Sequence, residues 1–200
     1  MLNNNTLHIT IYSESTPNPG VMKFVCNKQI LFSSPIEFLN ANEGKNNFIA
    51  KKLFLLPIVK EVFIAKNFVS ITKHNSFLWE EYIDNIKEEI KIILTEYLNS
   101  TKSEEPDILP KKTSIKTKET NLNATEKKII EILDDYVKPA VESDGGNIKF
   151  ISFSEGTVSV LLQGACSGCP SSVITLKNGI ETLLKNMIGD DVKNVEAING

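Results

Sequence analysis

Arginine is absent from this chain of 200 residues, and all 22 of its basic side chains are lysine. Without guanidinium groups the protein has no planar, two-pronged donor for phosphate or for the edge of guanine. The formal net charge is −3, and no basic face is evident in the sequence. These features argue against nucleic acid as a partner.

Long apolar runs are also missing, since none approaches the roughly 20 residues that a membrane-spanning helix needs. Membrane is therefore not an expected partner. Residues 1–6 carry neither the basic and apolar regions of a secretory signal nor the Arg-rich character of an organelle transit peptide. From this we expect a cytoplasmic location.

Cysteine is scarce, with three residues in the whole chain. An odd number with two members in a Cys-x-x-Cys spacing, Cys166 and Cys169, does not fit a disulfide scaffold. It fits metal or redox chemistry in a reducing compartment. The third, Cys26, lies in an apolar stretch without a second cysteine nearby, so we expect it to be a structural, buried residue.

A change in composition divides the chain. Residues 101–122 are rich in Lys, Thr, Ser, Glu and Pro and hold only scattered apolar residues, so they predict a flexible linker. On either side we expect a small domain, at residues 1–100 and at residues 123–200.

The first domain shows both helical and strand periodicity. Apolar residues recur at steps of three and four from Trp79 to Leu98, which predicts an amphipathic helix. Two short apolar runs around Lys66-Asn67 predict a hairpin of strands at 59–65 and 68–72. The remaining predicted elements are strands at 7–13, 22–25 and 30–32 and a short helix within 46–55 that ends before Pro57.

The second domain has the order α-β-β-α-β. Asn123 and Glu126 resemble a capping box, and the helix that follows is expected to end at Pro139. Strands at 147–153 and 157–163, a helix after Pro170 and a strand at 191–198 complete it. The predicted fold class is thus α+β, with two small two-layer domains.

The pair Cys166 and Cys169 is predicted to lie in the loop between a strand and this second helix. Pro170 suits the first helical position, because its missing N–H has no partner there in any case. Unpaired N–H groups and the positive end of a helix dipole lower the pKa of a nearby thiol and favour a negatively charged metal–thiolate group.

Three uses of this pair remain open from the residues alone. A zinc site needs four Cys or His ligands, and the chain's histidines, His8 and His74, lie in the other domain. A dithiol oxidoreductase would cycle Cys166 and Cys169, although a thioredoxin-like fold needs more elements after the motif than this chain has. An iron–sulfur cluster needs four thiolates, which two chains supply if each gives two across a two-fold axis.

Two sets of motifs resemble the NifU-like (Nfu) family. The run from Gly164 to Pro170, preceded by Asp144-Gly145-Gly146 and the predicted strand pair, resembles the C-terminal domain of these proteins over about residues 123–198. Upstream, four features resemble the N-terminal domain of the family: Thr16-Pro17-Asn18-Pro19, Lys23-Phe24, the hairpin at 59–72 and Trp79.

The resemblance implies a non-enzymatic iron–sulfur scaffold or carrier. Such a protein holds a [4Fe–4S] cluster between two chains of a homodimer, receives it from upstream assembly machinery and passes it to apo-proteins. Carried over to this sequence, the cluster ligands are Cys166 and Cys169.

Overall fold

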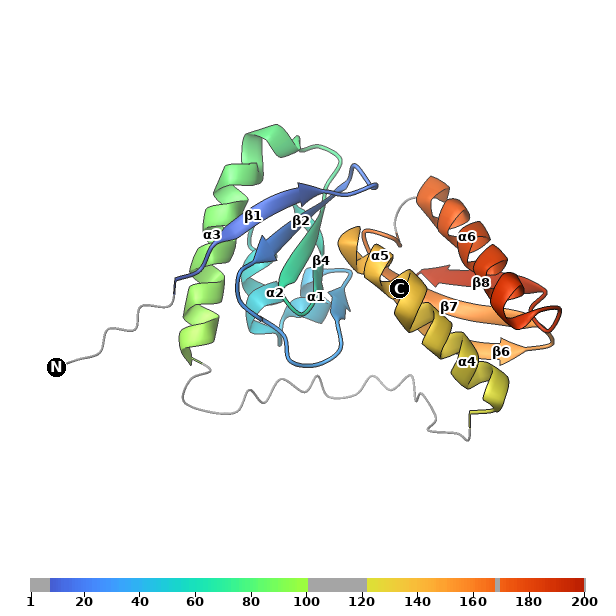
Figure 1. Cartoon of the computed structure of the whole chain (residues 1–200). Coiled ribbons are helices and arrows are strands. Elements are labelled where there is room, and N and C mark those ends of the chain that lie inside the picture. The colour runs from blue at the N-terminus through green and yellow to red at the C-terminus, as the bar shows by residue number, and fades with distance from the viewer. Residues whose placement is uncertain (1–7, 101–121, 168–169, 200) are drawn as a thin grey trace. The chain divides into compact units, whose positions relative to one another are not determined.

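The computed structural model describes residues 8–100, 122–167 and 170–199. These residues form two compact units, one holding the elements from β1 to α3 and the other those from α4 to β8 (Figure 1). Each unit has its own sheet and its own main hydrophobic core. The predicted linker lies outside the described residues except for Leu122, so the domain boundaries stay a prediction.

The first unit is an antiparallel sheet of five strands with helices packed on it. The strand order is β1-β2-β5-β4-β3. Its elements are β1 (Ile11–Ser15), β2 (Val21–Cys26), β3 (Ile36–Phe38), α1 (Ala41–Gly44), α2 (Phe48–Leu53), β4 (Val59–Ile64), β5 (Phe68–Lys73) and α3 (Trp79–Ser100).

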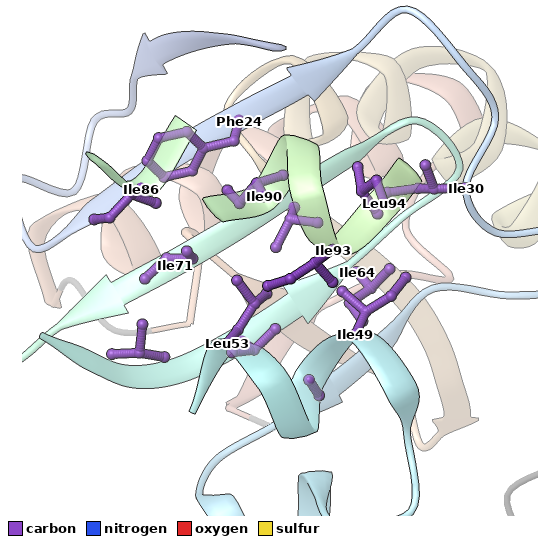
Figure 2. Close-up of a cluster of buried hydrophobic side chains, with 14 of the residues drawn as sticks. Phe24, Ile30, Ile49, Leu53, Ile64, Ile71, Ile86, Ile90, Ile93 and Leu94 are labelled. Carbon is purple, nitrogen blue, oxygen red and sulfur yellow. The ribbon is translucent and has the colours of Figure 1, made fainter. Parts of the chain in front are cut away.

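The predicted helix and hairpin of this unit are confirmed. Helix α3 buries one apolar stripe against the sheet and α2, and Figure 2 shows Ile86, Ile90 and Leu94 pointing into this cluster. Phe24 reaches the same cluster from β2, and its ring meets that of Trp79 edge to face, with centroids 6.3 Å apart. On one face of a strand the side chains recur every two residues, and on one face of a helix about every 3.6 residues. The core is made of both kinds of face packed together.

The strand predicted at residues 30–32 is wrong. The backbone N–H groups of Ile30 and Leu31 both donate to the carbonyl oxygen of Lys66, at 2.8 and 3.2 Å, so the segment attaches at one point and forms no ladder. Ile30 is nevertheless fully buried. Ile30 is apolar because it is buried under the turn between β4 and β5. The next strand in the chain after this segment is β3.

The second unit has the predicted order, and the α+β class is confirmed. Its elements are α4 (Ala124–Ile132), η2 (Leu133–Val137, a π-helical turn), α5 (Lys138–Ser143), β6 (Gly146–Ser154), β7 (Thr157–Gly164), α6 (Pro170–Ile188) and β8 (Asn194–Asn199). Strand β7 is central: it pairs antiparallel with β6 and parallel with β8. Helix α6 is the crossover that the parallel pair requires.

The first helix of this unit runs past the position where it was expected to end. Asn123 and Glu126 form the predicted capping box. At the far end the N–H of Lys138 donates to the carbonyl of Leu133, five residues back, so the helix widens before Pro139 and then continues to Ser143. A proline in a regular helix would clash with the carbonyl four residues earlier, and the wide turn relieves this contact.

The helices of the second unit cover one face of its sheet. Ile129 and Ile132 from α4 and Ile180 and Leu184 from α6 lie in one cluster with the buried strand residues. On β7 this buried face consists of the predicted residues Val158, Val160 and Leu162. In the part of the chain that the structure describes, no helix combines the length and apolarity needed to cross a bilayer.

Candidate metal centre

The candidate site is the connection between β7 and α6. Strand β7 ends at Gly164 and α6 begins at Pro170, so five residues join the central strand to the crossover helix. Cys166 lies within this connection. Cys169 lies outside the described residues, so the placement of the pair as a whole stays a prediction.

Two glycines in the left-handed region shape the start of this connection. Gly164 has φ 66° and Gly145 has φ 84°, conformations that residues with a Cβ rarely adopt. Beyond Gly164 the chain makes a turn, in which the N–H of Ser167 donates to the carbonyl of Gly164 at 3.1 Å and its hydroxyl donates to the same oxygen at 2.8 Å. The N–H of Ala165 donates to the carbonyl of Gly145 at 3.2 Å, which ties the turn to the start of β6.

These bonds turn the Cys166 side chain towards the inside of its own unit. Only 7% of Cys166 is exposed, and it belongs to the core cluster that includes Val141 and Leu162. The thiol that the sequence analysis predicted as a metal ligand is therefore held among apolar side chains.

Burial and, to a smaller extent, the negative charge of Asp144 raise the pKa of Cys166 from its ordinary value of 9.0 to about 11. The sequence analysis predicted a lower pKa, because a helix begins just after the cysteine pair. The prediction is wrong for Cys166 because removal of the thiol from water disfavours the thiolate more than the helix end favours it. The negative charge of Asp144 thus also disfavours the thiolate of Cys166.

We predict that the metal-free protein loses stability above pH 9 through this thiol. The folded pKa of Cys166, about 11, lies above its ordinary value of 9.0, so the neutral thiol stabilises the fold fully below pH 9 and this contribution is lost as the pH rises towards 11. Between pH 8 and pH 10.5 the loss amounts to about 2 kcal/mol. Denaturant unfolding of the wild type and of Cys166→Ala at both pH values measures it as a difference between the two proteins. An identical pH dependence in both would contradict the prediction.

One buried polar pair beside the site was not foreseen. The amide of Asn147 donates from Nδ2 to Oε1 of Gln163 at 3.1 Å, and the two residues face each other across β6 and β7. Asn147 is 5% exposed, and its Oδ1 has no hydrogen-bond partner among the described residues. The sequence offered only one signal, an amide residue in a strand directly after two glycines.

The other candidate ligands lie in the first unit. His8 and His74 are exposed there. Cys26 is 2% exposed in β2, and burial raises the pKa of its thiol, as expected of a structural cysteine. Among residues 8–100, 122–167 and 170–199, no three His, Cys, Asp or Glu side chains lie together as a metal site.

Two family models match the chain. The family described as NifU-like domain matches residues 129–196, which include the candidate site. The family described as scaffold protein Nfu/NifU N terminal matches residues 11–101. Between them they cover both units of this α+β protein.

Two curated relatives align with more than nine tenths of this chain. The human protein named NFU1 iron-sulfur cluster scaffold homolog, mitochondrial, is 31% identical over 192 residues, which cover 96% of this chain and 72% of the human one. NifU-like protein 5, mitochondrial, of Arabidopsis thaliana is 32% identical over 192 residues, covering 93% of this chain and 66% of the plant protein. A solution structure of a NifU-like protein from Saccharomyces cerevisiae aligns with a TM-score of 0.36 and 24% identity over 56% of this chain and 92% of that one.

The chain belongs to the NifU-like (Nfu) family, as the resemblance of its motifs predicted. It spans about two thirds of the length of the curated relatives it matches, with 66% and 65% for two Arabidopsis proteins.

The predicted cytoplasmic location is wrong. The plant and human relatives are named as mitochondrial proteins. The prediction depended on the composition of residues 1–6 alone, and neither those residues nor the composition of the two units specifies a compartment.

Proposed function

We propose that the protein is a scaffold and carrier for iron–sulfur clusters. In this proposal Cys166 and Cys169 of one chain and the same pair of a second chain hold one [4Fe–4S] cluster, which is the cargo and not a resident cofactor. The role is that of a carrier and not of an enzyme. By the names of its relatives we also propose a mitochondrial location.

The observation that carries the proposal is the donor set. A [4Fe–4S] cluster takes four thiolates, and the chain has three cysteines, of which Cys26 is buried in the first unit. Two thiols three positions apart along the chain, those of Cys166 and Cys169, remain between β7 and α6. Two chains then complete the set, and the assembly is a homodimer closed through the cluster.

This arrangement suits transfer better than storage. Each chain supplies only two of the four sulfur donors, so thiolates of an apo-protein can replace them in turn while the cluster remains ligated. Apo iron–sulfur proteins are therefore the proposed recipients, and the assembly machinery that builds clusters is the proposed donor.

Anaerobic reconstitution with iron and sulfide tests the proposal. We expect about two iron atoms per chain, broad absorption near 400 nm, as is typical of such clusters, and a change from monomer to dimer on loading. Size-exclusion chromatography with iron and sulfide analysis of the same fractions measures all three. A colourless monomer after strictly anaerobic loading would contradict the proposal.

The two remaining uses of the pair give different results. A zinc site shared by two chains would bind about half a zinc ion per chain without colour. A dithiol oxidoreductase would reduce a protein disulfide such as that of insulin in the absence of metal, and would need no dimer.

A further inference from the structure

Gly146 lies at the open end of the β6–β7 hairpin, where the connection with Cys166 begins. It is the first residue of β6 and pairs with Gly164, the last residue of β7. Cys166 follows two positions later and folds back over this end because of the turn at Gly164. The sulfur therefore returns to the strand that starts at Gly146.

The space beside Gly146 is filled by the Cys166 side chain. A Cβ on Gly146 would lie 2.9 Å from the Sγ of Cys166 and 3.2 Å from its Cβ. It would also lie 2.6 Å from the carbonyl oxygen of Gln163, a backbone atom of β7 that no change of rotamer can move. All three distances are shorter than ordinary contacts between heavy atoms, which are 3.5 Å or more for carbon.

We propose that Gly146 is a positioning residue, whose missing side chain leaves the seat in which the Cys166 thiol rests while the carrier is empty. The role follows from geometry: Gly146 gives the sulfur a place against β6, inside the core cluster of the unit. Its importance for cluster transfer depends on the proposed function, because Cys166 matters there only as a ligand.

A seat of this kind protects a reactive ligand. A cluster shared with a second chain needs the sulfur at the surface, so loading moves Cys166 out of the seat and release lets it return. Between loads the thiol stays away from oxidants and alkylating agents, which act on accessible sulfur. The empty carrier thus keeps its ligand reduced without a bound metal.

The first test is the rate at which iodoacetamide modifies Cys166 in metal-free protein. In a Cys169→Ser background only Cys26 and Cys166 remain as thiols, and Cys26 in the first unit serves as an internal reference. We expect Gly146→Ala to raise the rate at Cys166 about tenfold or more, because a small increase in the open population of a local segment is enough. The rate at Cys26 should not change.

Gly179→Ala is the matched control. Gly179 lies in α6, and apart from its own helix backbone no described atom lies within 4 Å of a Cβ added there. This variant should leave both alkylation rates at their wild-type values. If Gly146→Ala also leaves the rate at Cys166 unchanged, the seat does not exist and the proposal is overturned.

A double-mutant cycle keeps the test decisive if Gly146→Ala lowers stability generally. The shift in unfolding midpoint caused by Gly146→Ala is measured in the wild type and again in Cys166→Ala, both as full-length metal-free chains. The seat predicts a smaller shift in Cys166→Ala, because the sulfur is no longer there to be displaced. An equal shift in both backgrounds would mean that the loss of stability comes from the contact with the Gln163 carbonyl oxygen and not from the Cys166 sulfur. That result would overturn the proposal. Neither test involves iron, so its failure is distinct from failure of cluster binding.

Discussion

Replacing either Cys166 or Cys169 by alanine is expected to lower the iron content of reconstituted protein from about two atoms per chain to nearly zero. Loss of one thiolate from each chain leaves two donors for a cluster that needs four, and water is a poor substitute at these positions. The loss of absorption near 400 nm and of the cluster-dependent dimer should accompany it. Anaerobic reconstitution followed by iron, sulfide and size analysis measures the effect.

Cys26→Ala is the matched control for these variants. Cys26 is buried in the first unit, so its loss should leave the iron content at the wild-type value. It should cost some stability, since the thiol packs in the core. Loss of iron from Cys26→Ala, or retention of the full iron content by Cys166→Ala, would show that the ligand set has been assigned wrongly.

Phe24→Ala is expected to lower the free energy of unfolding of the first unit by about 3–5 kcal/mol. The ring is 1% exposed and packs edge to face on Trp79, so its removal leaves a cavity in the cluster of which Figure 2 shows a part. Trp79 is the chain's single tryptophan, and its fluorescence therefore reports on this unit. Denaturant titration of the full chain by tryptophan fluorescence measures the loss.

The same variant tests whether the two predicted domains are independent. We expect the hydrogen-exchange protection of the β7 amides in the second unit to be unchanged when Phe24 is replaced. Phe32→Ala, at a position that is 70% exposed, is the control and should shift neither measurement. A parallel loss of protection in β7 would mean that the chain unfolds as one unit, and the domain division would then be wrong.

Elements with long, regular periodicity were predictable from the sequence. The apolar spacing after Trp79 gave α3 almost to its end, and the alternation of Val158, Val160 and Leu162 gave the buried face of β7. Both predictions are correct because each apolar pattern repeats several times and each results from burial of one face of the element. The short run at Ile30 failed because three apolar residues specify burial but not a hydrogen-bonding partner.

At the site, residue types were predictable and their surroundings were not. The spacing of Cys166 and Cys169 and the glycines around them indicated metal or redox chemistry directly. The direction of the pKa shift at Cys166 depends on where the turn places the sulfur, and that depends on the local bonds from Ser167 to Gly164 and on the long-range bond from Ala165 to Gly145. Consecutive glycines at 145 and 146 were a visible signal of close approach, but the atom approaching was set by the register of β6 and β7.

The wide turn before Pro139 has a consequence for insertions and deletions. Its hydrogen bond reaches from Lys138 back to Leu133, one residue further than in a regular helix, so it holds one extra residue without breaking the helix. A homologue that lacks this residue and has no proline here can run straight through as an ordinary helix, with the caps and apolar contacts on both sides unchanged. A length difference of a single codon would thus be absorbed inside the helix and not in a loop.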